Sequence, residues 1–282
     1  MRFSTPSTVR SSVCTLTLAW RTFGDAPVAV AATRDEAVDR RSEPPAVRDA
    51  DGNRVRYVAP RDAAAGGTWI GVSESGVVAA VANRWLDADR EGDRSRGLLV
   101  ADCLTAASAE DAVRSAEREL DARAYDGFSL VLADGRAAFL LSYDGGLAVT
   151  RLRPGVHVVG NVGGVVNGTE RFAVPARRRE AGGRRADSAR QIAGALAPEP
   201  GETGTAWVDR AGDVLADHEY GACRHGDGFG TRSFTRIRTG RDPAVEFADG
   251  PPCETAAEPV PLPSGFATAD AVSGGDGAEG QF

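Results

Sequence analysis

Short runs of alternating apolar and polar residues recur along the chain, and this alternation is typical of strands that bury one face. The first run reads CTLTLAW and places Cys14, Leu16, Leu18 and Trp20 on the same face. Two pairs of runs are joined by short turns and predict hairpins. The predicted strands cover residues 14–20, 27–32, 67–73, 76–82, 128–133, 136–143, 147–152, 156–161, 231–238 and 244–248.

Helical patterns lie between and after these strands. Ser108 and Asp111 have the spacing of a capping box, so a helix is expected to begin after Ser108. Hairpins at both ends of the chain with paired helical segments between them predict sheets covered by helices, in an α+β layered domain. The predicted helices cover residues 95–104, 109–123, 187–196 and 205–217.

The patterns predict a single domain over residues 14–254. Within it, the segment 163–185 is rich in Gly, Pro and Arg, and we interpret it as a mobile excursion. The segment 255–282 is rich in Ala, Pro, Gly and Ser and is predicted to be disordered. Neither a Gly-rich phosphate loop nor a regular strand–helix alternation supports a nucleotide-binding sheet.

Composition excludes several classes of function. The formal charge of -7 and the sequence pI of about 5.2 argue against a nucleic-acid partner. No apolar stretch is long enough to cross a bilayer, so no membrane span is expected. The four cysteines are far apart in the sequence, which argues against a disulfide scaffold and favours a reducing, cytoplasmic location.

Residues 1–13 form an extension without the apolar core of a secretory signal. The sequence changes abruptly at Cys14 into a strand-like run. We hypothesise that translation starts at Val13, which would be read as methionine and trimmed to leave Cys14 as the first residue.

Cys14 has two interpretations. A cysteine in a strand is most often a small buried apolar residue. An N-terminal cysteine can instead be a nucleophile, because its own α-amine, with a pKa of about 7.7–8.0, can take the thiol proton. Only three histidines are available as alternative bases, which favours a nucleophile of this kind.

Polar residues at other strand ends are candidates to support Cys14. Arg34 and Asp35 are either a surface ion pair or a thiolate-binding cation and a carboxylate that orients the α-amine. Asn83 and Asn161 are either turn residues or donors to an oxyanion. Arg232 is either a loop arginine or a second cation of the site.

Several motifs in a fixed order resemble the NRDE family, also called the transport and Golgi organisation protein 2 family. The resemblance spans residues 14–254. One position departs from the family pattern, because Thr33 replaces the asparagine of the Asn-Arg-Asp-Glu motif. The motifs are CTLTLAW, Thr33-Arg34-Asp35-Glu36, Gly66-Gly67-Thr68-Trp69-Ile70-Gly71, Asn83-Arg84-Trp85, Ser95-Arg96-Gly97, Gly160-Asn161-Val162-Gly163 and Gly230-Thr231-Arg232-Ser233.

The resemblance implies a four-layer αββα sandwich similar to the cysteine-type N-terminal-nucleophile hydrolases, such as bile-salt hydrolases and penicillin V acylases. It implies a small-molecule substrate with an amide or thioester bond and no required cofactor. Members of the family have also been linked to haem trafficking, so haem or another hydrophobic anion is the alternative ligand. By this resemblance the catalytic residues would be Cys14, Arg34, Asp35, Asn83, Asn161 and Arg232.

A second group of metal-binding residue types lies near the end of the predicted domain. His218, Cys223, His225 and Cys253 offer ligands for zinc, and the first three also offer ligands for haem iron. Their spacing matches no standard zinc site or covalent haem attachment. We therefore interpret them as part of a polar loop and predict no metal site.

Overall fold

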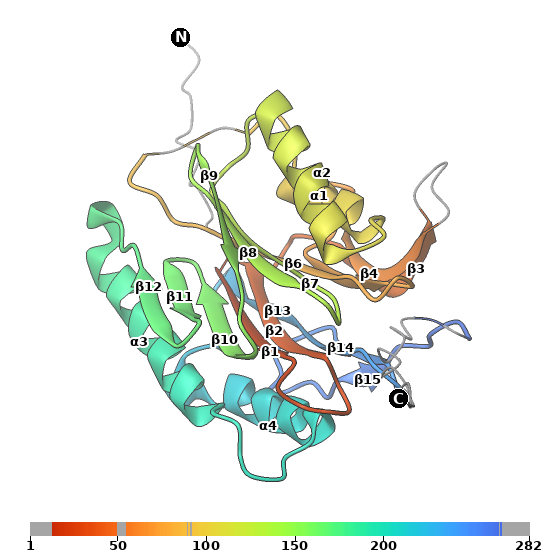
Figure 1. Cartoon of the computed structure of the whole chain (residues 1–282). Helices are drawn as coiled ribbons and strands as arrows, with labels where there is room; N and C mark the ends of the chain where they lie inside the picture. The colour runs from red at the N-terminus through yellow and green to blue at the C-terminus, as the bar shows by residue number, and fades with distance from the viewer. Residues whose placement is uncertain (1–12, 50–54, 89, 91, 265, 267–282) are drawn as a thin grey trace, which may run out of the picture.

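The computed structural model describes residues 13–49, 55–88, 90, 92–264 and 266, arranged in four layers (Figure 1). Two antiparallel sheets pack face to face, and two helices cover the outer face of each sheet. The predicted α+β fold, and the αββα sandwich implied by the family resemblance, are both confirmed. In the described part of the chain, no helix combines the length and apolar character needed to span a membrane.

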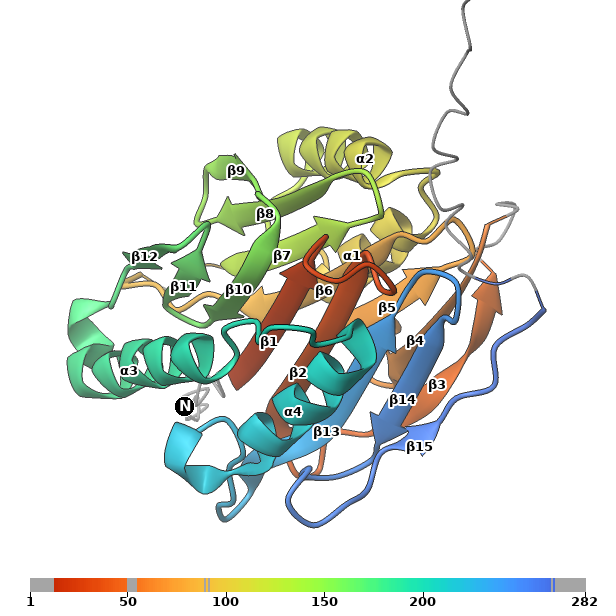
Figure 2. The same ribbon diagram turned by 60° about the horizontal axis from the view of Figure 1, so that its bottom comes forward.

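The larger sheet has eight strands, and its two central strands come from the N-terminal part of the chain. Helices α3 (Arg179–Ala195) and α4 (Gly204–Ala216) cover its outer face (Figure 2). In spatial order the strands are β12 (Thr169–Phe172), β11 (Gly163–Val166), β10 (Gly155–Gly160), β1 (Val13–Trp20), β2 (Val28–Ala37), β13 (Phe229–Arg238), β14 (Ala244–Ala248) and β15 (Glu258–Pro259).

The smaller sheet has seven strands and is covered by α1 (Arg96–Leu104) and α2 (Ala109–Ala122). Its strands follow the order of the chain, as in a meander. They are β3 (Ser42–Asp49), β4 (Arg56–Asp62), β5 (Ile70–Ser73), β6 (Val78–Asn83), β7 (Phe128–Ala133), β8 (Ala138–Tyr143) and β9 (Leu147–Arg151). Short 3₁₀ turns occur at Ala176–Arg178 and His218–Tyr220.

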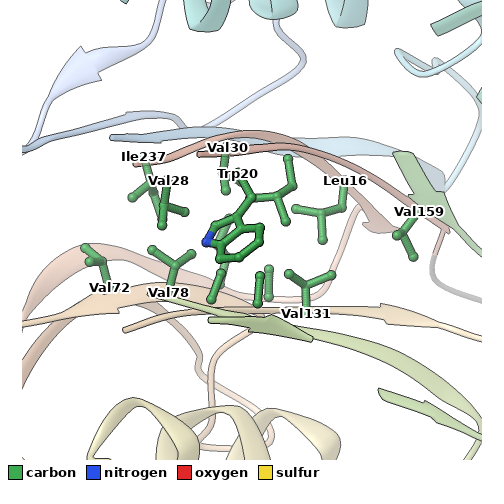
Figure 3. Packing of buried hydrophobic residues seen from close by; sticks show 14 of the residues in the cluster. Leu16, Trp20, Val28, Val30, Val72, Val78, Val131, Val159 and Ile237 are labelled. Carbon is green, nitrogen blue, oxygen red and sulfur yellow. The ribbon is translucent and has the colours of Figure 1, made fainter. Parts of the chain in front are cut away.

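The alternation of β1 explains how the layers pack. Leu16, Leu18 and Trp20 point into the core between the sheets, whereas Ala19 belongs to the core under α3 and α4. Figure 3 shows Trp20 between valines of both sheets. The predicted apolar face of the first strand is confirmed, and Cys14 lies on that same inter-sheet face.

Trp20 and Asp134 connect three of the layers. The Trp20 indole N–H donates to the Asp134 backbone carbonyl at 2.8 Å, across the space between the sheets. The Asp134 carboxylate accepts from the backbone N–H of Ala109 at 2.7 Å, at the start of α2, and from that of Ala137 at 2.8 Å, in the β7–β8 turn. One residue therefore links both sheets and a helix.

Two predictions of segments without regular structure were wrong. The segment 163–185 is not an excursion, because it forms β11, β12 and the first half of α3. The start of the predicted tail is also ordered: β15 pairs with β14, and Phe266 is buried in the inter-sheet core. Residues 267–282 and the first twelve residues lie outside the described part of the chain.

The Trp20 contact can be measured by substitution. Trp20→Phe should lower the free energy of unfolding by about 1–3 kcal/mol, because the buried Asp134 carbonyl loses its donor. Trp20→Ala should lower it by about 3–5 kcal/mol, because a large cavity opens between the sheets. Chemical denaturation measures both, with Val149→Ala on the exposed β9 edge as a control expected to change stability by less than about 0.5 kcal/mol. Equal stability of wild type and Trp20→Phe would contradict the hydrogen bond.

Candidate functional site

Cys14 lies at the start of β1, where that strand runs between β2 and β10. It is partly exposed and borders a pocket of about 330 Å³ between the two sheets. The pocket is lined by Cys14, Arg34, Glu36, Ala37, Asp39, Arg40, Asp62, Thr68, Trp69, Val81, Asn83, Ser95, Arg96 and Gly97. The candidate nucleophile therefore faces a cavity that holds charged side chains of both signs.

Arg34 is the cation nearest to Cys14 in the strand pairing. The two residues are direct Cα partners in β1 and β2, so their side chains share the inter-sheet face. The Arg34 guanidinium lies 3.6 Å from Glu36 and 3.5 Å from Asp62, and it stacks 4.2 Å from the Trp69 ring centre. Its Nη1 is buried without a hydrogen-bond partner among the described residues.

The Cys14 thiol is held in its neutral form. Burial raises its pKa to about 12, and the charges of Asp35 and Glu36 raise it further, against the lowering effects of the Arg34 charge and the Asp35 backbone N–H. A thiol with this pKa needs a base to become a nucleophile at neutral pH. When residue 13 is attached, the nitrogen of Cys14 is an amide and cannot be that base.

Asp35 lies on the opposite face of β2. It is the Cα partner of Val13, the residue just before Cys14. Its Oδ1 accepts a hydrogen bond from the Thr231 hydroxyl at 2.6 Å, and burial raises its pKa to about 6. Asp35 is fully buried, and its Oδ2 has no hydrogen-bond partner in the described structure. The backbone of Asp35 therefore lies opposite the residue that precedes Cys14.

Asn83 and Asn161 come from different sheets and meet at one end of the molecule. The Asn161 side-chain amide donates to the backbone carbonyl of Asn83 at 2.8 Å, and the Asn161 backbone carbonyl accepts from the backbone N–H of Trp85 at 2.8 Å. Only Asn83 of the two lines the pocket. Asn161 thus connects the end of β10 to the end of β6, and Asn83 is the better-placed donor to a substrate.

Arg232 lies apart from the lining of the pocket. It occupies a bulge of β13, where the pairing with β2 shifts register between Thr231 and Ser233. Its Nε is buried with no hydrogen-bond partner in the described part of the chain. The structure thus brings Cys14, Arg34 and Asn83 to one pocket, with Asp35 behind them, but it does not bring Arg232 into that lining.

Several pocket residues were missed by the sequence reasoning. Glu36 was detectable, because it follows Arg34 by two positions on the same strand face. Arg96 was present in a family motif, and burial lowers its pKa while its guanidinium donates to the Gly127 carbonyl at 2.9 Å. Asp62 was not detectable, because its strand β4 was not predicted. Asp62 accepts from Arg40 at 2.8 Å.

Thr33, which replaces the family asparagine, points away from the pocket. Its hydroxyl lies 3.5 Å from the Ala222 carbonyl, in the segment before β13. The next residue, Cys223, belongs to the second group of candidate ligands. His218, Cys223, His225 and Cys253 lie together in space, although their sequence spacing did not predict it.

Two solved structures of similar fold are an acylase and an acid amidase. A penicillin V acylase from Agrobacterium tumefaciens has a TM-score of 0.55 and 16% identity, over 84% of this chain and 83% of its own. A Caenorhabditis elegans ortholog of N-acylethanolamine-hydrolyzing acid amidase has a TM-score of 0.50 and 13% identity, over 80% and 92%. The fold is thus that of the N-terminal-nucleophile hydrolases.

The sequence itself defines the family. Residues 13–175, more than half of the chain, match the profile of the Transport and Golgi organisation 2 family, and the protein belongs to that family. The predicted resemblance is confirmed. No curated protein sequence matches the chain.

The protonation state of Cys14 can be tested by alkylation. In a chain that retains residue 13, the rate of Cys14 labelling should rise about tenfold per pH unit between pH 7 and 10, because the thiolate fraction is small throughout that range. Peptide mapping after timed iodoacetamide exposure measures the rate, and the denatured chain is the control with an ordinary thiol. A plateau of the Cys14 rate below pH 9 would contradict the raised pKa.

Proposed function

We propose that the protein is a cysteine N-terminal-nucleophile hydrolase or acyltransferase that acts on an amide or thioester through an acyl-Cys14 intermediate. The proposal concerns a chain whose first residue is Cys14, because only then is the α-nitrogen a base. The observation that carries it is the buried Asp35 carboxylate, which has one unpartnered oxygen and lies opposite position 13. A positively charged α-ammonium at Cys14 would donate a hydrogen bond to that oxygen and balance the negative charge of the carboxylate.

The proposed reaction uses the α-amine to move one proton. The neutral amine takes the thiol proton, and the Cys14 thiolate attacks the carbonyl carbon of the substrate. The C=O electron pair moves to oxygen, and an N–H of Asn83 donates to this oxyanion. The intermediate collapses, the C–N or C–S bond breaks, and the leaving group takes the proton from the α-ammonium. Acyl-Cys14 remains.

The second half of the reaction decides between hydrolysis and transfer. Water, or an acceptor amine or thiol, gives its proton to the α-amine and attacks the thioester carbonyl. Collapse then breaks the bond to sulfur, and the Cys14 thiolate recovers the proton. The Arg34 charge stabilises the thiolate in both halves, since it already lowers the thiol pKa.

The similar solved structures support an amide substrate. Their names describe an acylase and an amidase. The pocket also suits a substrate with a polar or charged part, because arginines and carboxylates line it.

Turnover should depend on the first residue of the chain. A chain that begins at Cys14 should hydrolyse acyl-p-nitroanilides or acyl thioesters, and Cys14→Ala should reduce turnover to background. Retaining residue 13 should lower kcat/KM by about 10²- to 10⁴-fold, because the general base becomes an amide. Chromogenic assays measure the rates, and intact mass checks each N-terminus.

Two controls make this test specific. Asp35→Asn should lower kcat while leaving Cys14 open to alkylation, because it removes the group that orients the amine and not the nucleophile. Equal turnover by Cys14→Ala and wild type, or by the chains with and without residue 13, would rule out the proposal.

Binding of a hydrophobic anion such as haem is the second candidate function. It is favoured by Arg34, whose buried Nη1 has no hydrogen-bond partner among the described residues and could pair with a carboxylate. This function needs no free α-amine.

Haemin titration separates the two candidates. If the pocket binds the anion, Arg34→Gln should weaken binding roughly 10- to 150-fold, the loss expected for a hydrogen bond to a charged group. Absorbance spectra measure the affinity. Arg114→Gln, on the exposed face of α2, should bind as the wild type does. The absence of a saturable spectral change at micromolar protein would exclude this function.

A further inference from the structure

Four metal-binding side chains converge on the side of the larger sheet that faces away from the pocket. His218 begins the 3₁₀ turn after α4, Cys223 and His225 precede β13, and Cys253 follows β14. Their nearest ligand atoms all lie within 4.8 Å of one another. Two segments that are separated in the sequence by β13 and β14 therefore lie close together, and both carry side chains of types that commonly bind metal.

The distances between the ligand atoms of three of these residues are within roughly 0.5 Å of the edges of a tetrahedral zinc site. The Cys223 and Cys253 sulfurs are 3.3 Å apart, and His225 Nε2 lies 3.1 Å from Cys253 Sγ and 3.8 Å from Cys223 Sγ. Zinc–sulfur bonds of about 2.3 Å and zinc–nitrogen bonds of about 2.0–2.1 Å give tetrahedral edges of roughly 3.3–3.8 Å. The sulfur–sulfur edge of such a site is about 3.8 Å and its sulfur–nitrogen edge about 3.5 Å, so Cys253 Sγ would have to move outward by roughly 0.5 Å to match both.

A carboxylate lies where the outer shell of a metal site usually has one. His225 directs Nε2 at the two cysteines, and its Nδ1 lies 3.6 Å from the Glu254 carboxylate. Histidine ligands of zinc commonly donate their other ring N–H to a carboxylate, which fixes the ring orientation. Glu254 directly follows Cys253, so one short segment supplies both a ligand, Cys253, and the carboxylate beside the ligand His225.

We propose that His218, Cys223, His225 and Cys253 form a structural zinc site. Two thiolates and two imidazoles are a donor set that selects zinc among the abundant divalent cations, and four protein ligands leave no open position for a substrate. Binding releases one proton from each thiol and oxidises nothing. Four ligand atoms this close together leave no room for a porphyrin between them, so the site does not suit haem.

The site would fix the segment that supports Asp35. Arg224, between the proposed ligands Cys223 and His225, forms two hydrogen bonds with Thr231. Its backbone N–H donates to the Thr231 hydroxyl at 2.9 Å, and its backbone carbonyl accepts from the Thr231 N–H at 2.9 Å. The same hydroxyl donates to Asp35. A bound zinc ion thus holds one end of a chain of contacts that leads to β2.

Metal content tests the proposal without reference to catalysis. The full chain, purified under reducing conditions without chelator, should contain about one zinc ion per chain. Elemental mass spectrometry measures this content. Cys223→Ser combined with Cys253→Ser should reduce this to below about one tenth. Cys103→Ala, which removes a buried cysteine of α1 that packs against α2, should retain the metal.

Cobalt provides a second measurement that needs no variant. Cobalt(II) added to the metal-free, reduced wild-type chain should give the visible bands of a tetrahedral site and a sulfur-to-cobalt charge-transfer band, both removed by zinc. The proposal fails if the reduced chain binds neither metal, or if the double serine variant binds as much zinc as the wild type. It also fails if the protein, as isolated from cells, contains no metal and has Cys223 and Cys253 joined by a disulfide.

Discussion

The pairing of β1 with β2 is the constraint on which the candidate site depends. It sets Arg34 opposite Cys14 and Asp35 opposite Val13, so the cation shares the pocket with the thiol while the carboxylate lies on the other face of β2. A slip of one residue would exchange the two faces and move Asp35 into the pocket. The register is also held from the other edge of β2, where β13 bulges at Arg232 and the Thr231 hydroxyl binds Asp35.

The pocket places charges inside a sandwich whose core is otherwise apolar. Buried charges are costly unless they are paired, and here Arg34 is balanced by Glu36 and Asp62 at distances of 3.5–3.6 Å. These separations are longer than those of close ion pairs, so the network can rearrange around a charged ligand. Burial favours the neutral form of the Cys14 thiol, and under the proposed function the chemical state of the Cys14 nitrogen decides whether the pocket is reactive.

Alternation along strands was enough to predict sheets covered by helices and the face of Cys14, because burial of one face leaves a regular sequence signal. The four-layer sandwich was implied by the family resemblance. Alternation failed for β3, which contains two adjacent prolines, and for β4, which contains one. It also failed for β11, β12 and the start of α3, where glycine and arginine concealed the pattern. Site residues that follow one another along a single strand could be predicted from the sequence. Asp62 and the partners of Cys223 depend on contacts between distant segments, which the spacing of residues in the sequence does not record.

The contacts of Asp134 affect how the molecule unfolds. Its backbone carbonyl holds the central tryptophan of one sheet, and its carboxylate holds both the turn of the other sheet and the start of α2. Opening any one of these interfaces exposes groups that belong to the other two. The layers on that side of the sandwich should consequently melt together as one cooperative unit, with their most protected amides exchanging only through global unfolding.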